Sequence, residues 1–128
     1  MPDFTGNARV LIVDDESVIA DTLGLILGKN GYVARVAYSG EEAVRLAEFE
    51  PPDILISDLL LSGIDGIQTA VEIRKLSPRC RVLLISGQAI DPKTLQAANA
   101  DGPGFEVLLK PAHPQILLKR LKEIPAES

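Results

Sequence analysis

Short apolar runs alternate along this chain with segments whose apolar residues recur every three or four positions. Five of the runs have the length and composition of β-strands, namely residues 8–14, 32–38, 53–58, 81–86 and 105–109. The first, third and fourth runs are continuously apolar, which is typical of strands covered on both faces. The second run alternates and the fifth contains Glu106. We therefore expect the second and fifth strands at the two edges of a sheet.

The segments that follow the first two runs predict helices with defined ends. The first helix follows Asp15 and ends at Asn30-Gly31, a typical helix stop. Its apolar face comprises Ile19, Leu23, Ile26 and Leu27. The second helix opens with a Ser-x-x-Glu capping box at residues 39–42 and ends before Pro51-Pro52.

Three more helices are predicted in the second half of the chain. One spans about residues 64–76, and another lies near residues 91–100, with Asp91 as N-cap and Pro92 at the first helical position. The last covers about residues 114–124. Its apolar stripe comprises Leu117, Leu121 and Ile124.

Alternating strands and helices of this length favour a parallel sheet with right-handed crossovers and helices on both faces. The predicted fold class is therefore α/β, a doubly wound (βα)5 flavodoxin-like three-layer sandwich with strand order 2-1-3-4-5. One domain, residues 1–128 with a core at about 8–124, accounts for the whole sequence. In such sheets ligands bind outside the carboxyl ends of the strands, near the switch between strands one and three.

Acidic residues stand at the predicted switch point. Asp14 and Asp15 end the first strand and Asp58 ends the third, so their carboxylates should converge. Two like charges ~4 Å apart repel by about 4 kcal/mol at an effective dielectric constant of 20, so the cluster requires a positive partner. Lys110, at the end of the fifth strand, is one candidate, and a hard divalent cation such as Mg²⁺ is another.

A hydroxyl completes this set of groups, because Ser86 ends the fourth strand and is expected to point into the same crevice. A carboxylate can act as a nucleophile toward phosphorus, a metal can neutralise phosphoryl oxygens, and a lysine and a serine can hold the remaining oxygens. The combination is the one that aspartyl-phosphate chemistry requires.

Composition narrows the function classes. The net charge is −5 and no basic stripe is present, so we expect no nucleic-acid partner for this domain. No apolar run approaches the ~20 residues of a membrane span, and the first residues do not resemble a signal peptide. Cys80 is the only cysteine and begins an apolar run, which favours an inert buried thiol. A cytoplasmic location, without a membrane partner, is the expectation.

Simpler interpretations exist for each of these residues. Asp14 and Asp15 could serve only as N-capping residues of the first helix. Ser86 could begin an ordinary turn with the glycine after it, and the glycines within residues 62–66 supply a tight turn. His113 is best explained as an exposed residue near a helix start rather than as a phosphorelay or metal-binding group. Capping alone does not explain why Asp58 and Lys110 stand at the ends of two other strands.

Four motifs together resemble those of one known family, in its order and at nearly its spacing. They are "VDDE" (13–16), "ISDLLLSGIDGI" (56–67), "LLIS" (83–86) and "LLKP" (108–111). The chain is similar over essentially its whole length to the CheY-like response-regulator receiver domain of two-component signalling. The resemblance implies a phosphoprotein that uses Mg²⁺.

The resemblance also assigns the metal ligands. Asp15 is implied to be the main Mg²⁺ ligand, assisted by Asp14 directly or through water. Asp58 and the backbone carbonyl of Leu60 complete the protein's share of the metal shell.

Phosphoryl transfer is implied to involve three side chains. Asp58 is the phosphoacceptor, the Ser86 hydroxyl swings toward the phosphoryl group, and Lys110 pairs with it. By the same resemblance the Lys110-Pro111 bond is cis, as such bonds are nearly confined to X-Pro.

A receiver of this kind takes its phosphoryl group from a histidine kinase or a phosphotransfer protein, and acetyl or carbamoyl phosphate are small alternative donors. The phosphorylated form then changes a surface read by a downstream protein target. Homodimerisation through the fourth helix, fifth strand and fifth helix is one further option. Such a domain phosphorylates and dephosphorylates itself and is not a turnover enzyme.

Two other functions remain in view. A haloacid-dehalogenase-like phosphohydrolase also uses an aspartyl nucleophile, but places a second aspartate two residues later, where this chain has Leu60. A pseudo-receiver would serve as a docking module without phosphorylation. The intact set of aspartates, serine and lysine disfavours it.

Two positions depart from the family pattern. Ser62 stands where a proline is usual, which should loosen the loop after the phosphoacceptor. Val107 replaces the aromatic residue that commonly precedes the lysine by three positions, and the connection at residues 101–104 is about two residues longer than expected. Phe105 lies on the same strand face as Val107. We hypothesise that the usual coupling between hydroxyl and aromatic ring is weakened or rerouted through Phe105.

Overall fold

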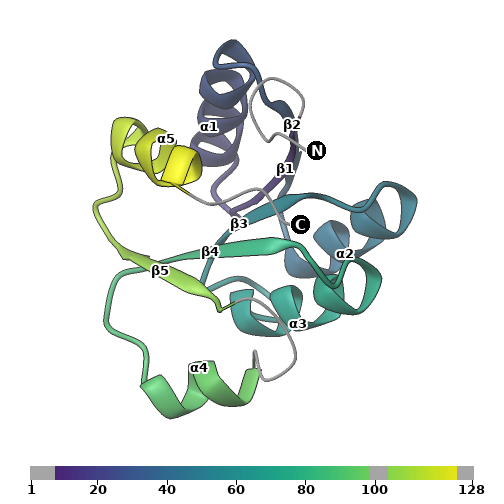
Figure 1. The fold of residues 1–128 in the computed structure, drawn as a ribbon, viewed down its shortest axis with the longest axis vertical. Coiled ribbons are helices and arrows are strands. Elements are labelled where there is room, and N and C mark those ends of the chain that lie inside the picture. Colours follow the sequence, from purple (N-terminus) through teal and green to yellow (C-terminus); the bar gives the residue numbers. More distant parts are fainter. Residues whose placement is uncertain (1–7, 99–103, 124–128) are drawn as a thin grey trace.

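The computed structural model describes residues 8–98 and 104–123. Its centre is an all-parallel five-stranded sheet with the order β2-β1-β3-β4-β5 (Figure 1). The strands are β1 (Arg9–Val13), β2 (Val33–Ala37), β3 (Ile54–Asp58), β4 (Arg81–Ser86) and β5 (Glu106–Leu109). The helices are α1 (Ser17–Lys29), α2 (Gly40–Phe49), α3 (Gly66–Leu76), α4 (Pro92–Ala98) and α5 (Pro114–Glu123). The predicted fold class and strand order are confirmed.

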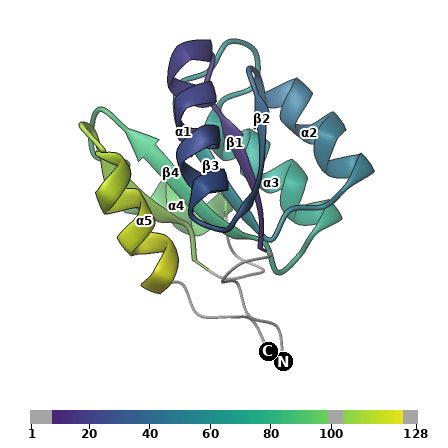
Figure 2. The same cartoon turned by 90° about the horizontal axis from the view of Figure 1, so that it is seen from above.

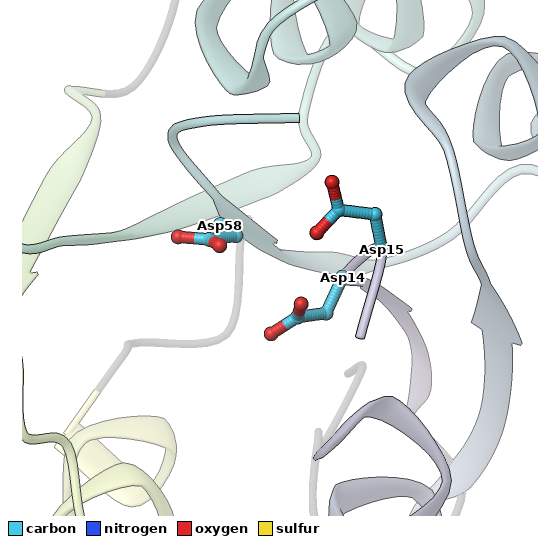
Figure 3. A group of neighbouring side chains, drawn as sticks. All are labelled: Asp14, Asp15 and Asp58. Atoms are coloured by element: carbon cyan, nitrogen blue, oxygen red, sulfur yellow. The ribbon is translucent and has the colours of Figure 1, made fainter. Parts of the chain in front are cut away.

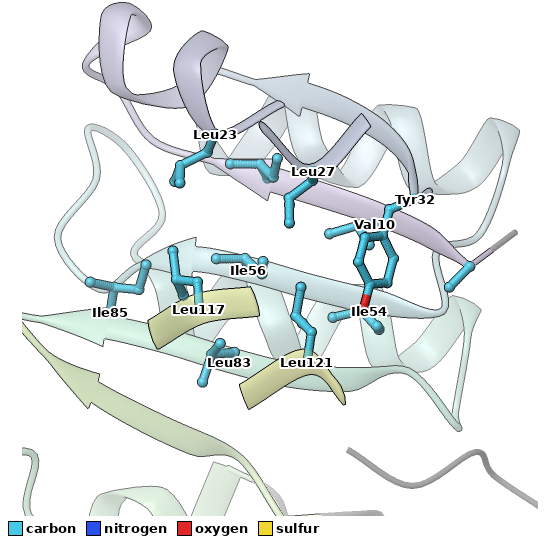
Figure 4. Close-up of a cluster of buried hydrophobic side chains, with 12 residues drawn as sticks. Val10, Leu23, Leu27, Tyr32, Ile54, Ile56, Leu83, Ile85, Leu117 and Leu121 are labelled. Atoms are coloured by element: carbon cyan, nitrogen blue, oxygen red, sulfur yellow. The ribbon is translucent and has the colours of Figure 1, made fainter. Parts of the chain in front are cut away.

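Helices cover both faces of the sheet, as the doubly wound topology requires. Helices α1 and α5 lie on one face, and α2 and α3 lie on the other, with α4 next to α3 (Figure 2). On the first face, side chains of α1 and α5 such as Leu27 and Leu121 pack against Ile54 and Ile56 of β3 (Figure 4). On the second face, α2 and α3 contribute mainly small residues and Ile73. The sheet is thus held at a fixed position between two apolar layers.

Burial along the strands follows their predicted places. Every residue of β3 is buried, and so are the last four of β1 and the last five of β4. In contrast, β2 has only Ala37 buried, and β5 contains no buried residue. The alternating run and the run with Glu106 are indeed the two edge strands.

The helix ends depend on short-range hydrogen bonds. Gly31, with φ of 94°, follows α1, as its position after the predicted stop requires. At the start of α2, Ser39 Oγ accepts the N–H of Glu42 at 3.1 Å. The Glu42 carboxylate accepts the N–H of Tyr38 at 2.7 Å, one residue before the N-cap to which a standard capping box would return.

Helix α3 begins two residues later than predicted, because Asp65 is its N-cap and forms a capping box with Gln68. Asp91 accepts the N–H of Lys93 at 3.0 Å before α4, as its predicted capping role requires. The predicted extension of this helix to residues 99–100 and the apolar role of Ile124 lie outside the described residues.

Two residues of the predicted apolar face of α1 are not in the buried core, because Ile26 is only partly buried and Ile19 is exposed. Leu23 and Leu27 are buried, whereas Ile19 remains 41% exposed. Ile19 faces a groove between α1 and the segment that joins β5 to α5. Its apolar side chain therefore contributes to a surface rather than to the interior.

Candidate functional site

Three carboxylates meet at the carboxyl ends of neighbouring strands. Asp14 and Asp15 follow β1, and Asp58 is the last residue of β3, which pairs with β1 in parallel (Figure 3). One oxygen from each carboxylate lies within 4.8 Å of the others. The convergence predicted from the sequence is confirmed.

Backbone contacts hold Asp14 in this group. Its N–H donates to the carbonyl of Ala37 at 3.2 Å, which extends the pairing of β1 with β2 by one residue. Its carboxylate accepts the N–H of Glu16 at 2.9 Å. This bond joins the acidic cluster to the residue before α1, so Asp14 serves the turn into the helix as well as the cluster.

The cluster carries an electrostatic cost. Asp14 is only 7% exposed, and burial is the main cause that raises the pKa of its carboxyl, with the charge of Asp58 acting in the same direction. The hydrogen bond from Glu16 and the charge of Lys110 act against this rise. A bound cation would therefore relieve a repulsion that the fold itself creates.

Lys110 provides the expected positive partner. Its Nζ lies 3.2 Å from Oδ1 and 3.3 Å from Oδ2 of Asp58. The Lys110 N–H donates to the carbonyl of Ser86 at 2.8 Å, and the bond from Lys110 to Pro111 is cis, as expected. The end of β5 thus places the ammonium group directly against the Asp58 carboxylate.

Ser86 is buried at the end of β4, but its hydroxyl is bonded to the loop that follows. The hydroxyl donates to the carbonyl of Gln88, and its oxygen accepts the Gln88 N–H at 3.1 Å. The two bonds form a tight turn, the simpler of the two roles considered for this residue. That the hydroxyl also reaches the acidic group stays a prediction, because in the described conformation both bonds go to Gln88.

The loop after Asp58 is bonded to β4 at its start, and its end is bonded back to its first residue. The N–H of Leu59 donates to Ile85 and that of Gly66 donates back to Leu59, both at 2.8 Å. A Cβ on Gly66 would lie 2.3 Å from the carbonyl oxygen of Asp58, so Gly66 is required by close approach of α3. Only Gly63, with φ of 78°, has the turn conformation predicted for both glycines.

Two contacts of this loop were not predicted. Ser62 Oγ donates to Oδ2 of Asp15 at 3.3 Å, and Glu41 of α2 accepts the N–H of Ile64 at 3.1 Å. In the sequence Glu41 stands in a capping motif, and nothing in that pattern indicates a contact 23 residues away. The contact of Ser62 could be foreseen only in part, because the sequence shows a serine in place of the usual proline in the loop after Asp58.

A groove of about 630 Å³ opens beside the cluster. Its walls come from α1 and from the segment between β5 and α5, and they are mainly apolar, with Val18, Ile19 and Pro111 among them. Asp14 and Lys110 also line it. The charged groups are therefore accessible from one side.

The donor set fits Mg²⁺. Oxygen ligands at 2.0–2.1 Å around an octahedral ion lie about 3 Å apart when adjacent and about 4 Å apart when opposite. The carboxylate oxygens here lie within 4.8 Å of one another, so Asp15 and Asp58 need only small movements or a bridging water to share such an ion. Mg²⁺ also keeps several waters in most sites, which suits the open side of the groove.

Fold and site together define a class: a doubly wound α/β protein with an acidic group and a lysine at its topological switch point. The sequence profile of the response regulator receiver domain matches residues 10–122. The chain belongs to this family. Within the described residues, no helix has the length and apolar character needed to cross a membrane.

Relatives and solved structures agree with this assignment. The transcriptional regulatory protein GlrR of Escherichia coli is 33% identical over 94% of this chain and 27% of its own length. The transcriptional activator protein ExaE of Pseudomonas putida is 36% identical over 91% of this chain and 55% of its own. The chain thus spans between about a quarter and about half of these two relatives.

Among solved structures, chemotaxis protein CheY4 of Vibrio cholerae has a TM-score of 0.80 at 29% identity, over 92% of this chain and 98% of its own. A response regulator of Chloroflexus aurantiacus has a TM-score of 0.75 at 37% identity, over 92% and 97% of the two chains. Both are similar to this chain over nearly its whole length.

His113 and Cys80, which the sequence analysis did not assign to the site, have the surroundings expected for them. His113 is exposed, and its carbonyl accepts the N–H groups of Ile116 and Leu117 in the first turn of α5. Cys80 is buried, and burial raises the pKa of its thiol to about 12. The interpretation of an inert thiol is supported.

Proposed function

We propose that this domain is a phosphoacceptor in two-component signal transduction, with Asp58 as the residue that receives the phosphoryl group. The observation that carries the proposal is the contact of Lys110 Nζ with both carboxylate oxygens of Asp58, next to two further carboxylates. Asp58 attacks phosphorus, the donor's histidine nitrogen leaves, and Lys110 holds a phosphoryl oxygen. Family membership supports a histidine kinase or a phosphotransfer protein as the donor.

Mg²⁺ would be held by Asp15, Asp58 and the Leu60 carbonyl, with Asp14 as a direct or water-mediated ligand. When bound, the ion supplies positive charge for the phosphoryl oxygens. Ser86 would leave its turn with Gln88 to bond the phosphoryl group, which couples phosphorylation to the loop after β4.

The downstream target would be a protein that reads the surface of α4, β5 and α5. Homodimerisation through the same surface is a further part of the proposal. We place the whole of residues 1–128 in one receiver domain.

The test is incubation with Mg²⁺ and either beryllofluoride or a small phosphodonor such as acetyl phosphate. We expect an adduct by mass spectrometry or ¹⁹F NMR in the wild-type protein and none in Asp58→Asn. Asp15→Asn should stay folded but lose Mg²⁺ affinity and phosphorylation together. Absence of any Asp58-dependent adduct would favour the docking module without phosphorylation.

A further inference from the structure

A carboxylate from another helix holds the loop between β3 and α3. Glu41, in the first turn of α2, accepts the N–H of Ile64 at 3.1 Å. The left-handed turn at Gly63 brings its Cα under the same carboxylate, since a Cβ there would lie 2.4 Å from Oε2 of Glu41. Glu41 therefore contacts two consecutive residues of the loop and stabilises their turn.

Hydrogen bonds and close packing hold the start of α2, from which Glu41 projects. The start of α2 is capped by Ser39 on one side and tied to Tyr38 through Glu42 on the other. Gly40 packs directly against the loop, as a Cβ on it would lie 2.6 Å from the side chain of Ile64. Gly40 and Glu41 of α2 are thus in contact with Gly63 and Ile64 of the loop.

The ends of the loop are fixed without Glu41. Leu59 is bonded to β4, and the N–H of Gly66 closes the loop onto Leu59. Inside the loop, Ser62 donates to Asp15 and Ile64 donates to Glu41. Serine at position 62 has no ring to restrict φ, so these two side-chain contacts take the place of the restriction that a proline would impose.

We propose that Glu41 is a positioning residue of the magnesium site, acting through the loop on the backbone carbonyl of Leu60. This inference rests on the proposed function, in which that carbonyl is a ligand. A hydrogen bond from a backbone N–H to a carboxylate is about twice as strong as one between neutral groups, so its loss frees the loop to leave the binding geometry.

The experiment compares Glu41→Ala, Glu41→Gln and a control, Glu48→Ala, which removes the same charge from an exposed position on the same helix. Mg²⁺ is titrated while the amide chemical shifts of Asp15 and Asp58 are followed by NMR. Hydrogen exchange of the Ile64 amide is measured in the metal-free protein, with circular dichroism as the check of folding.

We expect Glu41→Ala to bind Mg²⁺ about three- to tenfold more weakly and to exchange the Ile64 amide faster, since one such bond is lost. Glu41→Gln keeps an acceptor oxygen, so its affinity should lie within about twofold of the wild type. Glu48→Ala should match the wild type.

Three results would overturn the inference. Unchanged Mg²⁺ affinity in Glu41→Ala would show that the loop keeps its geometry alone. Equal losses in Glu41→Ala and Glu41→Gln would make charge, rather than the hydrogen bond, the cause. If the wild-type protein bound no Mg²⁺, the metal site of the proposed function would fail and this inference with it. Mg²⁺ binding by the wild type with an unchanged affinity in Glu41→Ala would refute this inference alone.

Discussion

Asp14 shows how a single residue can weaken the fold in order to build a site. Its carboxylate is buried beside Asp58, and its pKa is raised mainly by that burial. Such a group opposes folding when it is ionised and no cation is bound. The cost is accepted where binding later offsets it, which is common at functional sites.

The first prediction concerns Asp14→Asn. A pKa raised in the folded state means that the native chain holds the proton more tightly than the unfolded chain. The contribution of Asp14 to stability is therefore most favourable below its ordinary pKa of 3.8 and is lost as the pH rises through the raised value. Without Mg²⁺ near neutral pH, the asparagine variant should unfold a few degrees higher than the wild type.

Calorimetry with and without Mg²⁺ provides the measurement. The advantage of Asp14→Asn should disappear below the ordinary pKa, where both chains are uncharged at this position. It should shrink or reverse with millimolar Mg²⁺, which stabilises the wild type by binding to its native state. An equal unfolding temperature near neutral pH would contradict the electrostatic cost.

The second prediction is that the Cys80 thiol does not react in the folded protein. With its pKa raised to about 12 and its side chain buried, the thiol is almost entirely protonated near pH 8. A thiol reagent should therefore label the native protein only through unfolding. Labelling in buffer should be orders of magnitude slower than in denaturant, and a native rate near that of a free thiol would refute the prediction.

Some residues of the site could be predicted from the sequence and others could not. Asp15, Asp58 and Lys110 lie at the carboxyl ends of strands, so knowing the strand order is enough to bring them together. Glu41 belongs to a capping pattern that explains it locally, and its contact with Ile64 depends on how α2 packs against the following loop. Side-chain bonds between elements cannot be read from periodicity, which reports only the buried face of each element.

At the level of elements, β3 and α3 are closely packed at their junction. Gly66 allows the first turn of α3 to lie against the backbone of Asp58 and Leu59. The sequence indicated a turn here, but not that the helix must touch the strand it follows. The sequence pattern places the start of α3 two residues too early, because it does not show that Asp65 is the N-cap and forms a capping box with Gln68.

The prediction for this junction is that Gly66→Ala moves α3 away from the acidic group. A Cβ would lie 2.3 Å from the Asp58 carbonyl oxygen and 3.0 Å from the Leu59 Cα, both backbone atoms. Overpacking of this kind costs about 1–3 kcal/mol. Urea denaturation should show this loss of stability, together with weaker Mg²⁺ binding.

Gly28 offers a matched control on α1. A Cβ there would meet no atom within 4 Å, and the residue is in a helix. Gly28→Ala should therefore stabilise the protein by up to about 1 kcal/mol, since alanine loses less backbone entropy. A similar effect for both substitutions would show that steric contact at Gly66 is not the cause.

Across the whole molecule, the strand order could be predicted because alternation and continuous apolarity separate edge strands from interior ones. The same pattern cannot say how a change at the acidic group reaches the far side of the sheet. That depends on β5, where Val107 stands at the usual aromatic position and is only partly buried.

Phe105 packs in the same cluster as Val107, as their spacing predicted, and its side chain is buried on the face of the sheet covered by α2 and α3. The guanidinium of Arg74 lies over its ring, 4.9 Å from the centroid, and donates to the carbonyl of Cys80 at 2.6 Å. Val107 pairs with Leu84, so Phe105 is two residues further from the acidic group. The ring links β5 to α3 rather than standing next to Ser86.

The last prediction tests whether Phe105 carries the response to phosphorylation. Phe105→Ala should cost about 3–5 kcal/mol because it empties a buried site. If the coupling runs through the ring, the beryllofluoride-induced shifts in α4 and β5 should also shrink in NMR spectra. Leu27→Ala, a truncation on the opposite face of the sheet, controls for lost stability alone. Unaltered shifts in Phe105→Ala would show that the ring is structural, and Val107→Phe would then be expected to strengthen the response by restoring the usual ring.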